Sequence, residues 1–140
     1  MALNRDEMIA LARRHASSER NGDMATTLAT LEPDPLYELE PVGRVLHGMD
    51  AARRYYEHFF GTFWSFVEAS ERRAEWVTDE GMGLENVLRL RLPDGSRERH
   101  PVIGILVFGK TALAGERVWG SERLLRLMFG PVYDSSLPTV

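Results

Sequence analysis

The sequence predicts an α+β fold in which one strongly curved, cone-shaped antiparallel sheet wraps around three N-terminal helices. Apolar side chains recur at helical spacing in residues 4–21 and again in residues 48–64. From Ser65 to Ser121 the pattern changes to the two-residue alternation of strands. Helices that precede a run of strands indicate an α+β arrangement and not repeated βαβ units.

The composition predicts a globular domain that binds neither nucleic acid nor membrane. The 140 residues, 44% hydrophobic and 27% charged, suit a single domain spanning 1–140. A net charge of −4 with only isolated arginine pairs argues against a nucleic-acid partner. We expect a cytoplasmic protein, because there is no cysteine, the start does not resemble a signal peptide, and no apolar stretch approaches the roughly 20 residues of a membrane span.

Capping signals divide the N-terminal part into two helices. Asn4 is suited to cap the first helix, and Asn21-Gly22 to end it. Asp23 then caps a second, short helix that we expect to end before Pro33 and Pro35.

The middle of the chain predicts one strand and the third helix. Leu36 to Glu40 alternates and reads as a short strand. The third helix begins near Gly48 and runs to about Trp64, and its aromatic residues predict a thick buried face, with His58 on the solvent side.

Four strands joined by hairpins follow: residues 65–77, 83–92, 97–108 and 112–121. Turn signals at Pro93-Asp94-Gly95 and Gly109-Lys110 separate the later ones. In residues 83–92 the leucines share one face with Asn86, and Glu85 falls on the other unless a bulge reverses them. Residues 68–75 predict an outer, solvated face that includes Arg72. A curved sheet packed on helices leaves an apolar hollow where a small molecule can bind.

Polar residues on the inward faces are the candidates for chemistry. His100 shares a face with Gly104, which leaves space for a ligand, so we expect a pocket base or donor; the alternative is a half-solvated histidine at the strand edge. Asn86 is the one polar residue on its leucine face and needs a partner there. Of Glu116 and Arg117, only one can reach the hollow. The four histidines show no close ligand spacing, so we expect no metal site.

Four features of the sequence resemble the nuclear-transport-factor-2-like superfamily, in particular SnoaL-like domains of the polyketide cyclase and ketosteroid isomerase type. They are the opening helix ended by Asn-Gly-Asp, the stretch HGMDAARRYYEHFF, the PDG and FGK hairpins, and the closing stretch GERVWGSERLLRLMFG. The resemblance implies a cystatin-like α+β barrel. It leaves the function open, because this fold hosts isomerases, cyclases, dehydratases, epoxide hydrolases and non-catalytic binders.

The resemblance also suggests site residues. Trp119 stands at the aromatic position of the family's closing strand, which implies a stacking wall, and Ser121 stands where cyclase-like members usually carry an aspartate. A serine cannot act as a carboxylate base at neutral pH.

The residues themselves add two more candidates. Tyr37 and Tyr56 can line the pocket and offer hydroxyl groups, or simply pack in the core. The predicted catalytic residues are therefore His100, Asn86 and Ser121, and the predicted ligand-binding residues are Tyr37, Tyr56, Phe60, Glu85 and Trp119.

Two functions are consistent with these residues. The first is a pocket protein that acts on a small hydrophobic molecule without a cofactor, by proton transfer in an isomerisation, cyclisation or dehydration. The second is a non-catalytic binding or accessory module with the same pocket, which the serine at position 121 favours. Members of this fold commonly pair sheet to sheet, and the continuously apolar stretch VIGILVF supports a homodimer here.

Overall fold

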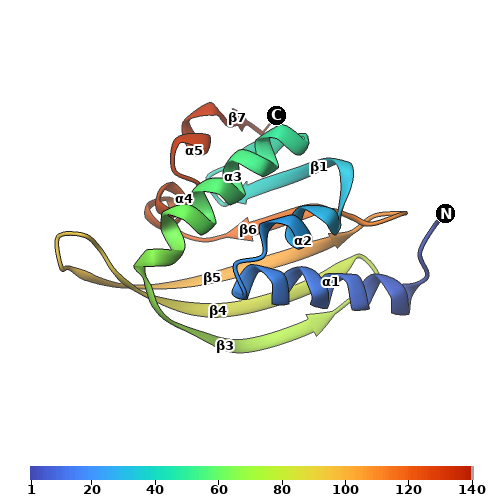
Figure 1. Cartoon of the computed structure of the whole chain (residues 1–140), viewed down its shortest axis with the longest axis horizontal. Coiled ribbons are helices and arrows are strands. Elements are labelled where there is room, and N and C mark those ends of the chain that lie inside the picture. Colours follow the sequence, from blue (N-terminus) through green and yellow to red (C-terminus); the bar gives the residue numbers. More distant parts are fainter. Residues whose placement is uncertain (140) are drawn as a thin grey trace.

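A computed structural model describes residues 1–139 and shows one seven-stranded sheet with helices packed on one of its faces (Figure 1). The strand order is β3-β4-β5-β6-β1-β2-β7, and the sheet curls without closing into a barrel. The helices are α1 (Arg5–Arg20), α2 (Met24–Ala29), α3 (Met49–Gly61), the short 3₁₀ turn η1 (Phe63–Phe66), α4 (Glu122–Phe129) and α5 (Pro131–Ser135). The strands are β1 (Leu31–Glu40), β2 (Arg44–His47), β3 (Val67–Val77), β4 (Gly81–Arg91), β5 (Arg97–Phe108), β6 (Leu113–Trp119) and β7 (Leu137–Pro138).

Side-chain caps start the first two helices where the sequence predicts them. The Asn4 side chain accepts a hydrogen bond from the Glu7 backbone N–H at 2.8 Å, and the Glu7 side chain accepts one from the Asn4 N–H at 3.1 Å. Asp23 Oδ1 accepts from the Thr26 N–H at 3.1 Å and begins α2. Within the described residues, none of the helices is both long and apolar enough to cross a membrane.

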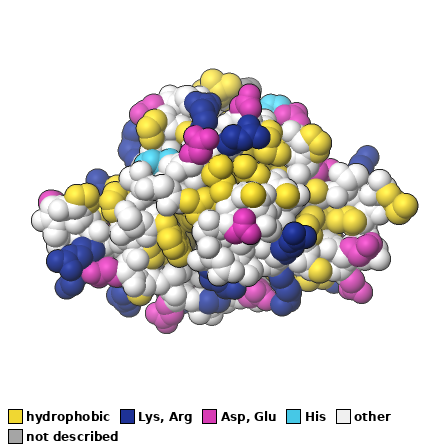
Figure 2. Space-filling view, viewed as in Figure 1, with side chains coloured by type: hydrophobic (Ala, Val, Ile, Leu, Met, Phe, Trp, Pro, Cys, Tyr) yellow, Lys and Arg dark blue, Asp and Glu magenta, His cyan; other side chains and the backbone are white. Residues whose placement is uncertain are grey.

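Aromatic packing buries one side of α3 and fixes the C-terminal segment against it. The ring of Tyr55 stacks on Phe129 of α4 with the centroids 4.0 Å apart. The predicted solvent position of His58 is wrong, because α4 covers that side of α3 and His58 Nε2 donates a hydrogen bond to the Leu127 carbonyl at 2.9 Å. Figure 2 shows the molecule from the same side as Figure 1, with hydrophobic side chains gathered near the middle and many of the charged side chains towards the edges.

The alternation of the long strands is confirmed and sets the inner face of the sheet. In the antiparallel register Leu84 lies opposite Gly104, and Gly104 lies opposite Val118 of β6. The pairing of β3 with β4 shifts between Arg72 and Ala74, and such irregularities bend and twist a strand. The inner face therefore curves around the space beneath α1 and α3.

The sheet also contains features that the sequence analysis missed. β1 begins at Leu31, includes both prolines, and pairs in parallel with β6, an exception to the antiparallel pattern. Its register shifts between Leu31 and Leu36, so the two prolines lie where the ladder is interrupted. The segments β2, α4, α5 and β7 were not predicted either.

We predict that Gly115→Ala strongly destabilises the fold. Gly115 has φ +143°, and an added Cβ would collide with the Leu36 carbonyl oxygen of the neighbouring strand. We expect a loss of roughly 2 kcal/mol or more in the free energy of unfolding, measured by urea denaturation. Gly61→Ala is the matched control, because nothing lies within 4 Å of its added Cβ. Equal stability of the two variants would contradict the assigned strand contact.

Candidate functional site

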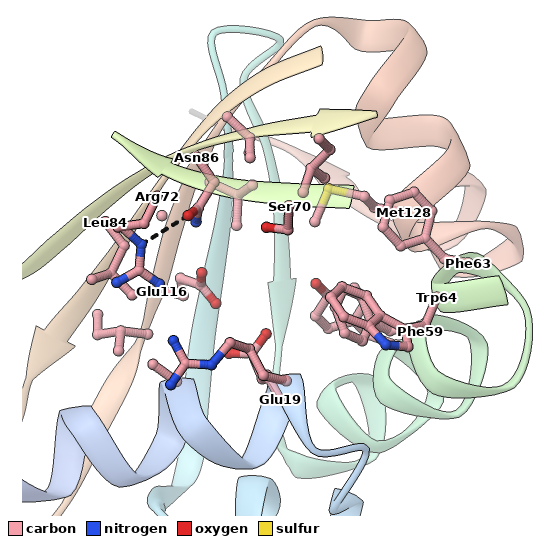
Figure 3. A pocket seen from close by; sticks show the side chains of 18 residues that line it. Glu19, Phe59, Phe63, Trp64, Ser70, Arg72, Leu84, Asn86, Glu116 and Met128 are labelled. Atoms are coloured by element: carbon pink, nitrogen blue, oxygen red, sulfur yellow. Dashed lines mark hydrogen bonds between the residues drawn. The ribbon is translucent and has the colours of Figure 1, made fainter. Parts of the chain in front are cut away.

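A cavity of about 110 Å³ lies between the inner face of the sheet and the helices α1 and α3 (Figure 3). Most of its wall is apolar and aromatic, and includes Tyr55, Phe59, Phe63, Trp64, Leu84 and Met128. The polar residues in the wall are few: Glu19, Arg20, Ser70, Arg72, Asn86 and Glu116. An apolar cavity with a few converging polar groups is the usual form of a small-molecule site.

Glu116 is the polar group most strongly enclosed by this wall. It lies on β6 and points inward, whereas Arg117 lies on the opposite face and pairs with Glu38 at 3.6 Å. Glu116 Oε2 is the one buried side-chain nitrogen or oxygen in residues 1–139 that has no hydrogen-bond partner. Its Oε1 fills the space that Gly104 leaves, since a Cβ there would lie 2.6 Å from it. That glycine, expected to make room for a ligand, thus makes room for a carboxyl group.

The surroundings of Glu116 favour its neutral form. Burial raises the pKa of the Glu116 carboxyl well above its usual value. A neutral carboxyl group is both a proton donor and an acceptor, so Glu116 can give a proton to a bound molecule or take one from it.

Two further titratable residues, His15 and Glu19, lie beside Glu116 on α1. Thr30 Oγ1 donates to the Thr27 carbonyl at 2.6 Å, so it must accept from His15 Nδ1, also at 2.6 Å. The other ring nitrogen, His15 Nε2, lies 2.7 Å from Glu19 Oε1 and 3.1 Å from the Tyr56 hydroxyl. A contact this short between Nε2 and a carboxylate requires a proton between them, which makes His15 and Glu19 together a neutral pair.

Two buried tyrosines complete this network. The hydroxyl groups of Tyr37 and Tyr56 lie 2.6 Å apart. Burial raises the pKa of both phenols well above the usual value, so they stay neutral. Phe60 stacks on Tyr56 with the ring centroids 5.7 Å apart. None of these three residues lines the cavity, and their roles in ligand binding stay predictions.

His15, Glu19 and Glu116 are also the residues of the described chain that could hold a metal ion. One ligand atom from each lies within 4.8 Å of the others. The 2.7 Å between His15 Nε2 and Glu19 Oε1 is a hydrogen-bond distance, so a cation would have to displace the proton that the two share. The spacing of the histidines alone could not reveal this group, because two of its three members are carboxylates.

Asn86 and Arg72 form the polar side of the cavity on β4 and β3. Asn86 lines the cavity and its Oδ1 accepts from Arg72 Nε at 2.8 Å (Figure 3). Glu85 points to the outer face and pairs with Arg73 at 3.7 Å. The structure thus decides between Asn86 and Glu85. Arg72 is exposed, as predicted, but its predicted place on the outer face is wrong, because this residue lies at the register shift of β3 and reaches the cavity.

The remaining predicted residues lie away from the cavity wall. His100 is on the inner face but beyond the cavity, and its Nε2 lies 2.7 Å from Glu98 Oε1. Hydrogen bonds from Arg123 and His100 lower the pKa of Glu98 to about 2. Ser121 Oγ accepts from the Leu124 backbone N–H at 3.0 Å and caps α4, and the Trp119 side chain is exposed. The functional roles assigned to His100, Ser121 and Trp119 stay predictions.

Sequence reasoning left Glu116 as an open alternative and missed Glu19. For Glu19 a signal was present, because His15 and Glu19 are four residues apart on the predicted first helix and therefore share one face. For Glu116, alternation alone could not say which side of the strand faces inward.

No family model matches the sequence, and no curated protein matches it at the sequence level. Among solved structures, the fold is similar to an NTF2-like protein of unknown function from Cytophaga hutchinsonii (10% identity, 81% of this chain and 99% of that chain, TM-score 0.67). It is also similar to an NTF2-like protein from Anabaena variabilis (13% identity, 87% and 95%, TM-score 0.68). A SnoaL-like protein from Mesorhizobium loti is similar as well (16% identity, 79% and 96%, TM-score 0.61).

These likenesses, at low sequence identity, concern the fold. They agree with the resemblance that the opening helix, the aromatic third helix, the hairpins and the closing stretch suggest. The chain has the fold of the nuclear-transport-factor-2-like superfamily, to which SnoaL-like proteins belong.

Proposed function

We propose that this protein binds a small, mainly apolar molecule in the cavity and exchanges a proton with it through Glu116. One observation carries the proposal: the buried Glu116 Oε2 has no partner within the described residues and belongs to the wall of an apolar cavity. An unpaired buried polar atom costs stability, and a ligand atom that pairs with it recovers that cost on binding.

The chemistry needs no cofactor. A neutral Glu116 donates its proton through one carboxyl oxygen to a basic atom of the ligand, while its other oxygen accepts the proton that the ligand releases from the neighbouring carbon, so the carboxyl ends the step with one proton as it began. Asn86 lies in the same wall and offers an amide N–H₂ group as a further donor. Proton transfer of this kind supports isomerisation, cyclisation or dehydration.

Non-catalytic binding is the second candidate, and the position of Ser121 favours it. Cyclase-like relatives usually carry an aspartate at that position, whereas Ser121 here caps a helix outside the cavity wall. In this case Glu116 anchors the ligand without chemistry.

We also propose that a second copy of the chain covers the outer face of the sheet. Trp76 and Trp119 are 38% and 42% exposed, and Ile103 lies directly opposite Trp119 in the register. Ile105 and Val107, further along β5, are only half-buried. Together these side chains form an apolar outer patch of the kind that a partner covers.

The dimer can be tested with Ile105→Glu, which places a charge in the middle of this patch. We expect the unmodified protein to sediment as a dimer and Ile105→Glu as a monomer, because the added carboxylate would have to lose its water of hydration when a second copy covers the patch. Gly61→Ala serves as the control and stays dimeric. A monomeric unmodified protein would contradict the proposal.

Deuterium exchange tests the proton transfer. Cyclohexanone is the probe, because it is small, mainly apolar and exchanges hydrogens next to its carbonyl group. We expect the protein to bind it and to accelerate its deuteration in heavy water, followed by NMR. Glu116→Gln should bind it within a few-fold of the unmodified protein and lose the acceleration, since an amide cannot exchange the proton in this way. Glu85→Gln, on the outer face, should behave like the unmodified protein.

The outcomes separate the two candidates. Binding without accelerated exchange in any form of the protein supports the non-catalytic candidate. Acceleration that persists in Glu116→Gln contradicts the role of Glu116, and absence of binding contradicts both candidates.

The pH dependence of stability tests the neutral state of Glu116. Because its folded-state pKa lies well above 4.5, the folded protein retains a proton that the unfolded chain releases as the pH rises past 4.5. The unmodified protein should therefore lose stability relative to Glu116→Gln as the pH rises from this value, by at most about 1.4 kcal/mol per pH unit. Urea denaturation at several pH values measures the difference. Parallel stability curves for the two proteins would show that Glu116 is ionised in the folded state.

A further inference from the structure

The charges around the cavity leave Glu116 without a counter-charge. His15 and Glu19 share a proton and compensate each other across 2.7 Å. Arg72 is committed to Asn86 at 2.8 Å and to Glu75 at 3.4 Å, and Arg20 is an exposed residue at the edge of the cavity. The other titratable groups near Glu116 are the neutral phenols Tyr37, Tyr55 and Tyr56. The carboxyl group of Glu116 therefore needs either a proton or a cation from outside the protein beside it.

Aromatic rings supply the second half of a cation site. Tyr55, Phe59, Phe63 and Trp64 line the same cavity. They form one connected group, because the ring centroids of Phe59 lie 5.7 Å from Tyr55, 5.6 Å from Phe63 and 5.7 Å from Trp64. The faces of such rings carry negative charge density and attract organic cations, most strongly when water is excluded.

We propose that the ligand is a small amine with an apolar body, bound as its ammonium ion against Glu116 and the aromatic wall. This inference rests on the proposed function and names the basic atom as a nitrogen. When a neutral amine enters, the Glu116 carboxyl passes its proton to the nitrogen, which yields a carboxylate and an ammonium ion. When the ammonium ion enters, the Glu116 proton leaves to the solvent. Either way, the buried carboxylate gains an opposite charge.

The cavity limits the size of this amine. An apolar cavity of about 150 Å³ in another protein accommodates benzene. The present cavity, at about 110 Å³, suits one ring or a short branched chain, with part of the ligand reaching towards Arg20 at the edge.

Matched ring compounds test the charge preference. Cyclohexylamine, cyclohexanol and cyclohexanecarboxylate share one apolar body and differ in the charge of the polar group. Calorimetric titration at neutral pH with EDTA present measures each affinity. We expect the amine to bind at least about tenfold more tightly than the alcohol, and the carboxylate to bind most weakly.

Three variants assign the preference to its residues. Glu116→Gln should reduce the amine to the affinity of the alcohol, because the amide carries no charge. Trp64→Leu should weaken the amine more than the alcohol, because it removes a ring and keeps an apolar side chain. Glu85→Gln should leave the preference unchanged, because that carboxylate lies on the outer face.

Several results would overturn the inference. If cyclohexanol binds the unmodified protein as tightly as the amine, the ligand class is wrong, whereas the proposed function stands. If the preference for the amine persists in Glu116→Gln, the charge lies elsewhere. If none of the ring compounds nor cyclohexanone binds, the proposed function fails as well. Zn²⁺ should also be titrated in EDTA-free buffer. If Zn²⁺ binds saturably, if Glu116→Gln abolishes this binding and if Zn²⁺ excludes the amine, the ligand of the cavity is an inorganic cation and the inference is wrong.

Discussion

A carboxyl group held against an apolar wall is the constraint on which the rest of the site depends. Water would solvate the ionised form of Glu116, but the cavity offers it no partner, so the group keeps its proton or acquires a counter-charge from outside. The proposed proton exchange and the proposed amine ligand both follow from this choice. The neighbouring His15 and Glu19 do not relieve Glu116, because each already satisfies the other.

Irregular features of the sheet position the carboxyl group of Glu116. Gly104 lacks the side chain that would occupy the position of the carboxyl, and Gly115 lets β6 approach β1 at the point where the strands pair in parallel. The shift in β3 brings Arg72 to the cavity beside Asn86. Two glycines and one irregular strand thus decide which side chains surround the site, although none of these positions performs chemistry itself.

Much of the fold could be predicted because its signals are local. The caps at Asn4 and Asp23, the aromatic face of α3 and the alternation around Asn86 each depend on neighbours in the sequence. The parallel pairing of β1 with β6 could not be predicted, because two prolines disguise the strand and its partner lies far along the chain. Alternation placed Asn86 on the leucine face of its strand, but it could not say which of Glu116 and Arg117 points inward. The sequence also predicted a catalytic role for Ser121, whose hydroxyl group caps a helix in the structure.

The pairing of Tyr37 with Glu116 has a consequence for how the protein reaches its native state. The two strands are far apart in the sequence, so a long loop must close before they can pair. Contacts of this kind slow folding, because the entropy of loop closure is lost before the contacts stabilise the chain. During synthesis, the ribosome must release most of the polypeptide before β1 can meet β6. We therefore expect the binding cavity to form late and cooperatively, with the strand pair that carries its carboxyl group as the final closure.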